Sequence, residues 1–280
     1  MLFDRANDVV AAGGLVYFGS SADCRVVALD AATGTVEWTF PMPRVRGEPL
    51  VRDIDGDGRA EILVGAGDGL FHNDTRILSK FRVLLGGRPP SLLSAAIAQD
   101  NVFFTFNGAN QELPYPGGPV GPPGVLHLER KRFLWDERLY ERITCTNYSR
   151  DVVLLPLAIE FGADFRDMFE VRGMKRARRG HMLAPVIDGR RVRFTYIGLD
   201  QVERSSVIAF SDPPGRLSAG RAEFMYSLAP EGSLELYVEI GATEAHTPSR
   251  ERFRDGAARA RWDMRARRRH GARLRSSGRL

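Results

Sequence analysis

Cysteine is nearly absent from this chain of 280 residues: Cys24 and Cys145 are the only two, and they form no CxxC pair. A metal site built on cysteine spacing is therefore not expected. A disulfide between the two residues is one interpretation, and two free thiols in a reducing cytosol is the other. We expect the second, and hence a cytoplasmic protein.

Long apolar stretches are also missing. No run approaches the roughly 18–20 uninterrupted apolar residues that a membrane span requires. The first residues, from Met1 to Asp8, lack a basic segment followed by an apolar core, so we expect no signal peptide. The sequence thus predicts a protein with no membrane partner.

A net positive charge is confined to one segment of the chain. Residues 249–280 hold 12 Arg against Glu251, Asp255 and Asp263, a balance of 12 − 3 = +9. The whole chain has a net charge of +5, so the remainder carries 5 − 9 = −4. Clustered Arg can bind nucleic acid by releasing counterions, but no reader motif accompanies it. We favour a basic linker helix and do not expect nucleic acid as a partner.

The tail has the pattern of a helix. Thr247 and Pro248 predict an N-cap followed by proline at the first helical position. A narrow apolar stripe follows at spacings of four, three and four residues, and consists of Phe253, Ala257, Ala260 and Met264. Gly271 is the expected stop. We expect this to be a linker helix that is frayed in the isolated chain.

Helical periodicity is lacking between about residues 69 and 243, apart from one turn near Asp164 to Phe169. Apolar residues alternate there with period two, as in Val153 to Phe161, Val192 to Tyr196, and Leu234 to Ile240. Alternation over many short runs separated by Gly- and Pro-rich turns is typical of an antiparallel β-sandwich. We therefore predict an all-β fold with a basic C-terminal helix.

The front of the chain, residues 1–68, predicts short strands of another kind. The segment from Gly13 to Phe40 begins Gly-Gly-Leu-Val-Tyr-Phe-Gly-Ser and continues through Ala-Leu-Asp and Thr-Gly to Trp38. It closely resembles one repeat of quinoprotein-type β-propellers. A propeller needs roughly four or more blades, and the resemblance covers one. We expect a partial, propeller-blade-like segment.

A second propeller-like motif follows in this front segment. The run from Pro49 to Gly65 resembles an FG-GAP repeat, with acidic residues at alternate positions: Asp53, Asp55, Asp57 and Glu61. Hard oxygen ligands spaced in this way can converge on Ca²⁺. Val64 stands where an EF-hand would need glutamate, which excludes that motif. A calcium-stabilised turn and a solvated Asp/Gly turn are both consistent with the pattern.

Residues 69–243 contain a series of motifs in order: Gly69-Leu-Phe-His-Asn-Asp-Thr-Arg, Leu126-His-Leu-Glu-Arg, Arg132-Phe-Leu-Trp-Asp, Ala163-Asp-Phe-Arg-Asp-Met-Phe-Glu-Val-Arg-Gly and Arg176-Ala-Arg-Arg-Gly. Through these motifs the segment resembles the N-terminal domain of bacterial glycogen debranching (amylo-α-1,6-glucosidase) proteins. The usual opening strands are replaced here by the propeller-like sequence. The Arg-rich segment 244–280 resembles the linker to the family's catalytic (α/α)₆ barrel.

This resemblance implies a non-catalytic domain that supports α-glucan binding and packs on that barrel. The family's catalytic acid and base lie in the barrel, so no residue here is expected to inherit those roles, and we expect no cofactor for the sandwich. The rival hypothesis is a Ca²⁺-stabilised, propeller-repeat binding or scaffold protein.

Candidate sugar-binding residues follow the first glycine-rich loop. His72, Asp74 and Arg76 would share one face if the stretch were extended. Carboxylate, imidazole and guanidinium groups suit ring hydroxyls, but an internal Asp–Arg network that fixes the loop is the alternative, and the pattern favours it slightly. We interpret Asp164, Asp167 and Glu170 as the polar face of a short turn, His127 as a hydrogen-bonded histidine, and Trp135 as part of the core.

Overall fold

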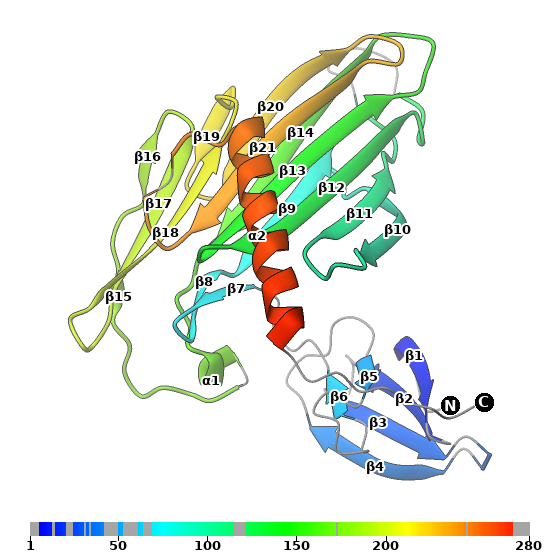
Figure 1. The fold of residues 1–280 in the computed structure, drawn as a ribbon, viewed down its shortest axis with the longest axis vertical. Helices are drawn as coiled ribbons and strands as arrows, with labels where there is room; N and C mark the ends of the chain where they lie inside the picture. The colour runs from blue at the N-terminus through cyan, green and yellow to red at the C-terminus, as the bar shows by residue number, and fades with distance from the viewer. Residues whose placement is uncertain are drawn as a thin grey trace. The chain divides into compact units, whose positions relative to one another are not determined.

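The computed structural model describes residues 6–12, 15–20, 25–30, 32–33, 35–41, 50–52, 61–63, 69–114, 121–171, 173–244 and 246–270 (Figure 1). The chain divides into two compact units. The first comprises residues 1–76 and 166–178, and the second comprises residues 77–165 and 179–280.

The first unit begins with a four-stranded antiparallel meander. Its strands β1 (Ala6–Ala12), β2 (Leu15–Ser20), β3 (Arg25–Asp30) and β4 (Val36–Pro41) pair in sequence order. The turn between β3 and β4 is fixed by the Asp30 carboxylate, which accepts hydrogen bonds from the backbone of Ala32 and Thr33. Two short pairs follow, β5 (Leu50–Arg52) with β6 (Glu61–Leu63) and β7 (Leu70–His72) with β8 (Thr75–Leu78).

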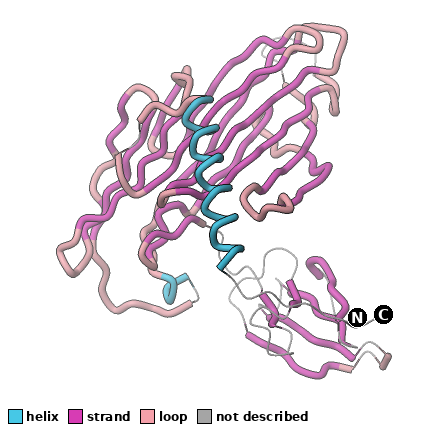
Figure 2. The backbone as a smooth tube through the Cα atoms, viewed as in Figure 1, coloured by secondary structure: helices cyan, strands magenta, loops and turns pink. Residues whose placement is uncertain are grey.

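The second unit is an antiparallel sandwich of one large and one small sheet (Figure 2). The large sheet has the order β10 (Ser91–Ile97), β11 (Phe104–Ala109), β12 (Leu126–Trp135), β13 (Arg138–Asn147), β21 (Ser233–Gly241), β18 (Glu203–Phe210), β17 (Arg191–Ile197) and β15 (His181–Met182). A ninth strand, β16 (Val186–Asp188), also pairs with β17. The small sheet has the order β19 (Arg216–Ser218), β20 (Arg221–Leu228), β14 (Val153–Gly162) and β9 (Lys80–Leu85).

The core lies between the two sheets and confirms the predicted alternation. In β14 the side chains of Leu155, Leu157 and Ile159 are almost fully buried, whereas Leu154 is 47% exposed. The ring of Phe210 in the large sheet lies 5.6 Å from that of Phe224 in the small sheet, with the edge of one toward the face of the other. The predicted all-β sandwich is therefore present.

Cys145 is one of these core residues and carries a free thiol. Burial raises the pKa of that thiol to about 12, so it remains protonated and behaves as a small apolar side chain. Cys24, the other cysteine, lies outside the described residues.

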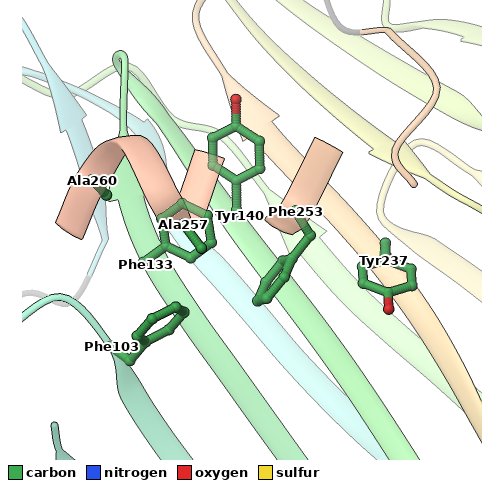
Figure 3. Packing of buried hydrophobic residues seen from close by; sticks show 7 residues of the cluster. All are labelled: Phe103, Phe133, Tyr140, Tyr237, Phe253, Ala257 and Ala260. Carbon is green, nitrogen blue, oxygen red and sulfur yellow. The ribbon is translucent and has the colours of Figure 1, made fainter. Parts of the chain in front are cut away.

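Helix α2 (Arg250–His270) lies against the outer face of the large sheet, over β12 and β13 (Figure 1). Figure 3 shows its apolar stripe meeting aromatic rings of the sheet in a cluster that we call the helix-dock cluster: Phe103, Phe133, Tyr140, Tyr237, Phe253, Ala257 and Ala260. The rings of Phe133 and Tyr140 are stacked 4.9 Å apart, and that of Phe253 meets Phe133 edge-on at 5.1 Å. The predicted stripe is confirmed for Phe253, Ala257 and Ala260, whereas Met264 is half-buried and outside the cluster. The expectation of a frayed helix is wrong, because the helix buries this stripe on the chain's own sheet.

Two details of α2 explain its position. The N-cap is Ser249 rather than the predicted Thr247: its hydroxyl accepts a hydrogen bond from the backbone N–H of Arg252, at 3.3 Å. Gly256 brings the helix close to the sheet, since a Cβ there would lie only 3.2 Å from the ring of Phe133 and 3.5 Å from that of Tyr140. The helix ends at His270, directly before the predicted stop.

Within the described residues, neither helix combines the length and the apolar character that a membrane crossing would require.

Candidate functional site

The predicted sugar-binding residues lie on the hairpin β7–β8 rather than on one extended stretch. Asn73 and Asp74 have φ values of 45° and 60°, so the chain reverses between His72 and Thr75. The assumption that His72, Asp74 and Arg76 alternate along one strand is therefore wrong. His72 is half-buried at the end of β7, Asp74 is exposed at the turn, and Arg76 is half-buried in β8. Their role in binding stays a prediction.

A segment from later in the chain pairs with this hairpin within the first unit. The N–H of Arg76 donates to the carbonyl of Arg166 at 2.8 Å, and the N–H of Met168 donates to the carbonyl of Asp74 at 3.0 Å. These backbone bonds hold the turn of the hairpin beside the start of helix α1 (Met168–Val171).

The carboxylates near α1 have a structural role. Asp167 accepts a hydrogen bond from the Glu170 N–H at 2.8 Å, and Glu170 accepts one from the Asp167 N–H at 3.1 Å, which is a reciprocal helix cap. Arg176 pairs with Asp167 at 2.7 Å. Burial raises the pKa of Asp167, but the backbone N–H of Glu170 and the Arg176 guanidinium outweigh it, so the net pKa is lowered. The interpretation of Asp167 and Glu170 as the polar face of a short turn is confirmed.

The predicted calcium loop is not described in the structure. Asp53, Asp55 and Asp57 lie outside the described residues, as does the side chain of Glu61, whose backbone is in β6. Elsewhere, among the side chains that the structure describes, no three His, Cys, Asp or Glu residues come together as metal ligands would. The calcium reading of the loop stays a prediction.

His127 and Trp135, the two single residues singled out in the sequence, both lie beside aromatic side chains. The ring of His127 lies 6.3 Å from that of Tyr148, edge to face. Trp135 is half-buried and packs against the helix-dock cluster on the outer face of the large sheet, so its interpretation as a residue of the sandwich core is wrong.

A charged cluster between the sheets was not predicted from the sequence. Glu141 in β13 is 1% exposed, and its carboxylate accepts a hydrogen bond from Arg130 Nε at 2.5 Å. Arg132 Nε lies 3.7 Å from the other carboxylate oxygen. The cluster thus holds two guanidinium groups for one carboxylate. Each guanidinium also faces an aromatic ring: Arg130 lies over Phe81 at 5.4 Å, and Arg132 over Phe104 at 5.2 Å.

The charges of this cluster are incompletely matched. Arg130 Nη2, Arg132 Nε and Glu141 Oε2 are buried and make no hydrogen bond to any described residue. Burial lowers the pKa of Arg132; Glu141 opposes this, and the charge of Arg130 adds to it. The sequence signal was available, because these charges occupy positions where alternation along β12 and β13 predicts the inner face.

A second ion-pair group joins α2 to the outer face of the large sheet. Arg252 makes two hydrogen bonds to Glu239, at 2.8 and 2.9 Å, and Glu239 is 2% exposed. Arg138 approaches the same carboxylate at 3.9 Å and also binds the Glu244 carbonyl at 3.0 Å. The helix is therefore held against the sheet by ion pairs in addition to its apolar stripe.

The comparison with protein families matches the sandwich. The model described as the N-terminal domain of (some) glycogen debranching enzymes covers residues 50–239, well over half of the chain. The chain belongs to this family. The propeller-like repeat predicted to precede this debranching-enzyme N-terminal domain is not shown: the match begins at residue 50, after the quinoprotein-like run, and it takes in nearly all of the run from Pro49 to Gly65.

Among curated proteins, no sequence matched this debranching-enzyme N-terminal domain. Solved structures similar to it include a protein described as a kojibiose phosphorylase from the human microbiome (TM-score 0.42, 9% identity, 92% of this chain and 33% of that chain). Others are a galactose mutarotase related enzyme from Lactobacillus acidophilus (0.30, 9%, 88% and 100%) and a 4-alpha-glucanotransferase from Thermococcus litoralis (0.28, 8%, 85% and 39%). TM-scores this low carry no argument about activity.

Proposed function

We propose that this chain acts as the non-catalytic N-terminal domain of a glycogen debranching (amylo-α-1,6-glucosidase)-like glycosidase. In this role it supports α-glucan binding and packs on a catalytic (α/α)₆ barrel. The observation that carries the proposal is the family match over residues 50–239, which takes in both sheets of the sandwich.

The surroundings of the carboxylates support a non-catalytic role. Glycoside hydrolysis uses two carboxyl groups, one on each side of a sugar, about 5–5.5 Å or 6.5–9.5 Å apart. The buried Glu141 and Glu239 are instead bound to arginines, and Asp167 and Glu170 cap α1. Each of these four groups is thus engaged in holding the fold.

Glucan release tests the non-catalytic part. The purified full chain, incubated with glycogen, should release no reducing sugar. Turnover that survives stringent purification, and that disappears when a carboxylate of this chain is replaced by its amide, would contradict the proposal.

Affinity electrophoresis in gels containing glycogen tests the binding part. The chain should migrate more slowly than in plain gels, and His72→Ala and Arg76→Ala should reduce the retardation. Arg88→Ala, a substitution at an exposed arginine that pairs with exposed Glu112, is the control. Equal retardation of all three variants would assign glucan binding to other residues. No retardation of the wild type would overturn the proposal that the chain binds glucan.

The front segment supports a second candidate, a Ca²⁺-stabilised binding or scaffold role. The observation in its favour is the β1–β4 meander, since a propeller blade is also a four-stranded sheet. Calorimetric titration with Ca²⁺ should give binding to the wild type and none to Asp55→Ala. Identical traces would leave a solvated turn.

A further inference from the structure

The two sheets of the sandwich are unequal: one has nine strands and the other four in the part of the chain that the structure describes. Sheets in a sandwich pack about 10 Å apart, and each covers the inner face of the other. Four strands cannot cover nine, so part of the large sheet's inner face is left open.

The open part lies beyond strand β9. The contact of Arg130 with the Phe81 ring places β9, the last strand of the small sheet, over β12. Strands β11 and β10 continue the large sheet past that point (Figure 1). Strand β10 is exposed along its whole length, and on the inner face Leu92 and Ile97 are 63% and 67% exposed.

Register places the inner-facing side chains of this region in rows across the strands. Ile97 pairs with Phe104, Phe104 with Arg132, and Arg132 with Glu141. The neighbouring rows add Phe106 and Leu134, the latter 61% exposed. We call this surface the inner shelf, and define it by Leu92, Ile97, Phe104, Phe106, Arg132 and Leu134.

The inner shelf has a smooth floor. An ideal Cβ on Gly108 would lie 2.8 Å from the ring of Phe106, so the absence of a side chain there lets that ring lie along the sheet. The floor is thus aromatic and aliphatic, with one arginine at its border.

The edge of strand β9 that faces away from β14 lies beside the shelf. The N–H of Leu85 donates to the Arg88 carbonyl, so it points away from β14. Phe81 and Val83 share that direction, because alternate residues of a strand point the same way. Among the described residues no strand pairs with this edge, and such a row of N–H and C=O groups is a template for another strand.

The excess of positive charge beside the inner shelf favours a ligand that carries a negative charge. Arg130 and Arg132 face a single carboxylate, Glu141, and the buried atoms Arg130 Nη2 and Arg132 Nε make no hydrogen bond to any described residue, although Arg132 Nε lies 3.7 Å from Glu141. The lowered pKa of Arg132, caused mainly by burial and opposed by Glu141, fits a guanidinium with too little negative charge around it. A further carboxylate beside Arg132 would correct this imbalance.

We propose that the β9 edge and the inner shelf together bind one extended β-strand of a partner chain. The strand pairs with β9 through its backbone and lays alternate apolar side chains on the shelf, and one of its inward residues is a glutamate or aspartate at Arg132. This is β-strand addition, in which main-chain bonds supply affinity and the side-chain pockets supply specificity.

A designed peptide tests the proposal on the full chain. The probe is a fluorescent octapeptide of alternating Val and Thr with one Val replaced by Glu. Its controls are a permuted peptide of the same composition with the Val residues grouped, and a version with Lys in place of Glu. In fluorescence anisotropy the alternating Glu peptide should bind saturably, and each control at least about tenfold more weakly, because it loses the alternation or the charge match.

Two matched variants locate the site. Ile97→Lys, on the shelf, should weaken binding of the Glu peptide by about tenfold or more, since it places a charge in an apolar contact. Met225→Lys, at a residue 60% exposed on the outer face of the small sheet, should leave binding unchanged. Circular dichroism and the thermal midpoint establish that both variants are folded.

Hydrogen exchange of the complex gives an independent readout, in which the amides of Phe81 and Val83 should gain protection. Three results would overturn the proposal: no saturable binding at millimolar peptide, equal binding of the permuted peptide, or equal weakening by the two variants. None of these depends on whether the chain binds glucan.

Discussion

Glu141 is the residue whose removal we expect to matter most among the charged side chains. It is 1% exposed and is the one carboxylate between Arg130 and Arg132. Removing one partner of a buried ion pair leaves an uncompensated charge in a region of low polarity, which costs about 3–5 kcal/mol. The cluster is therefore sensitive to a change of charge at constant shape.

The Glu141→Gln substitution should lower the free energy of unfolding by about 3 kcal/mol, measured by urea denaturation. Glu112→Gln is the control, because Glu112 is 58% exposed in its pair with Arg88, and such pairs contribute less than about 1 kcal/mol. Similar losses in the two variants would mean that the Glu141 cluster is well hydrated.

The hairpin of β17 and β18 offers a titration experiment. Hydrogen bonds from the Arg204 guanidinium and the Val202 N–H lower the pKa of Asp200 to about 2. Carbon-detected NMR should place the midpoint of this carboxyl near that value, and Arg204→Gln should raise it toward the ordinary value of about 3.9. Because the folded-state pKa is depressed, the associated stabilisation is present above pH about 4 and is lost as the pH falls through about 2. An unchanged midpoint in Arg204→Gln would assign the shift to the backbone donors.

At the scale of elements, helix α2 depends on its apolar stripe. Phe253 contacts three aromatic rings of the sheet, those of Phe103, Phe133 and Tyr237, at centroid distances of 5.1–6.3 Å. Phe253→Ala should cost about 3–5 kcal/mol, as large truncations in a core do, and should reduce the far-UV helical signal. Trp262→Ala, at a residue 72% exposed on the same helix, should change stability by less than about 0.5 kcal/mol. Equal effects would show that the helix is loosely attached.

The strands were predictable where one simple pattern governs them. In β14 and β21 every second residue is apolar, and all of these except the half-buried Leu234 are buried, so a single period determines both the strand and its inward face. Helix α2 was found from the same kind of reasoning, since Phe253, Ala257 and Ala260 repeat at helical spacing. Neither pattern says what the face will contact, which is why the docking of α2 on β12 and β13 was missed.

The candidate site was harder to predict, because it depends on local turns and distant partners. Two residues in the left-handed region, Asn73 and Asp74, suffice to separate His72 from Arg76 on opposite strands of a hairpin. The pairing of Glu141 with Arg130 depends on the register of β12 against β13, which no short window of sequence contains. Side chains that meet across strands are thus visible only once register is known.

At the scale of the whole chain, the two units should differ in stability. Central strands of a sandwich open only when the entire core opens, whereas small isolated sheets are marginal in water. Hydrogen exchange followed by mass spectrometry should show faster exchange in residues 8–50 than in residues 152–161 and 234–240, which lie in or next to β14 and β21. Equal protection in all three segments would show that the front segment is an integral part of one fold.

Close packing of α2 at Gly256 also fixes the position and orientation of the helix end relative to the sheet. Its 21 residues span about 31 Å at 1.5 Å per residue, and Gly256, Phe253 and the Arg252–Glu239 pair fix its roll angle on the sheet. Anything attached beyond His270 would inherit that distance and that angle. One alanine inserted after Ala260 would move the residues that follow the helix by only about 1.5 Å along its axis, but would rotate them by about 100° around it. The direction in which those residues leave the helix is therefore more sensitive to an insertion than their distance from the sheet.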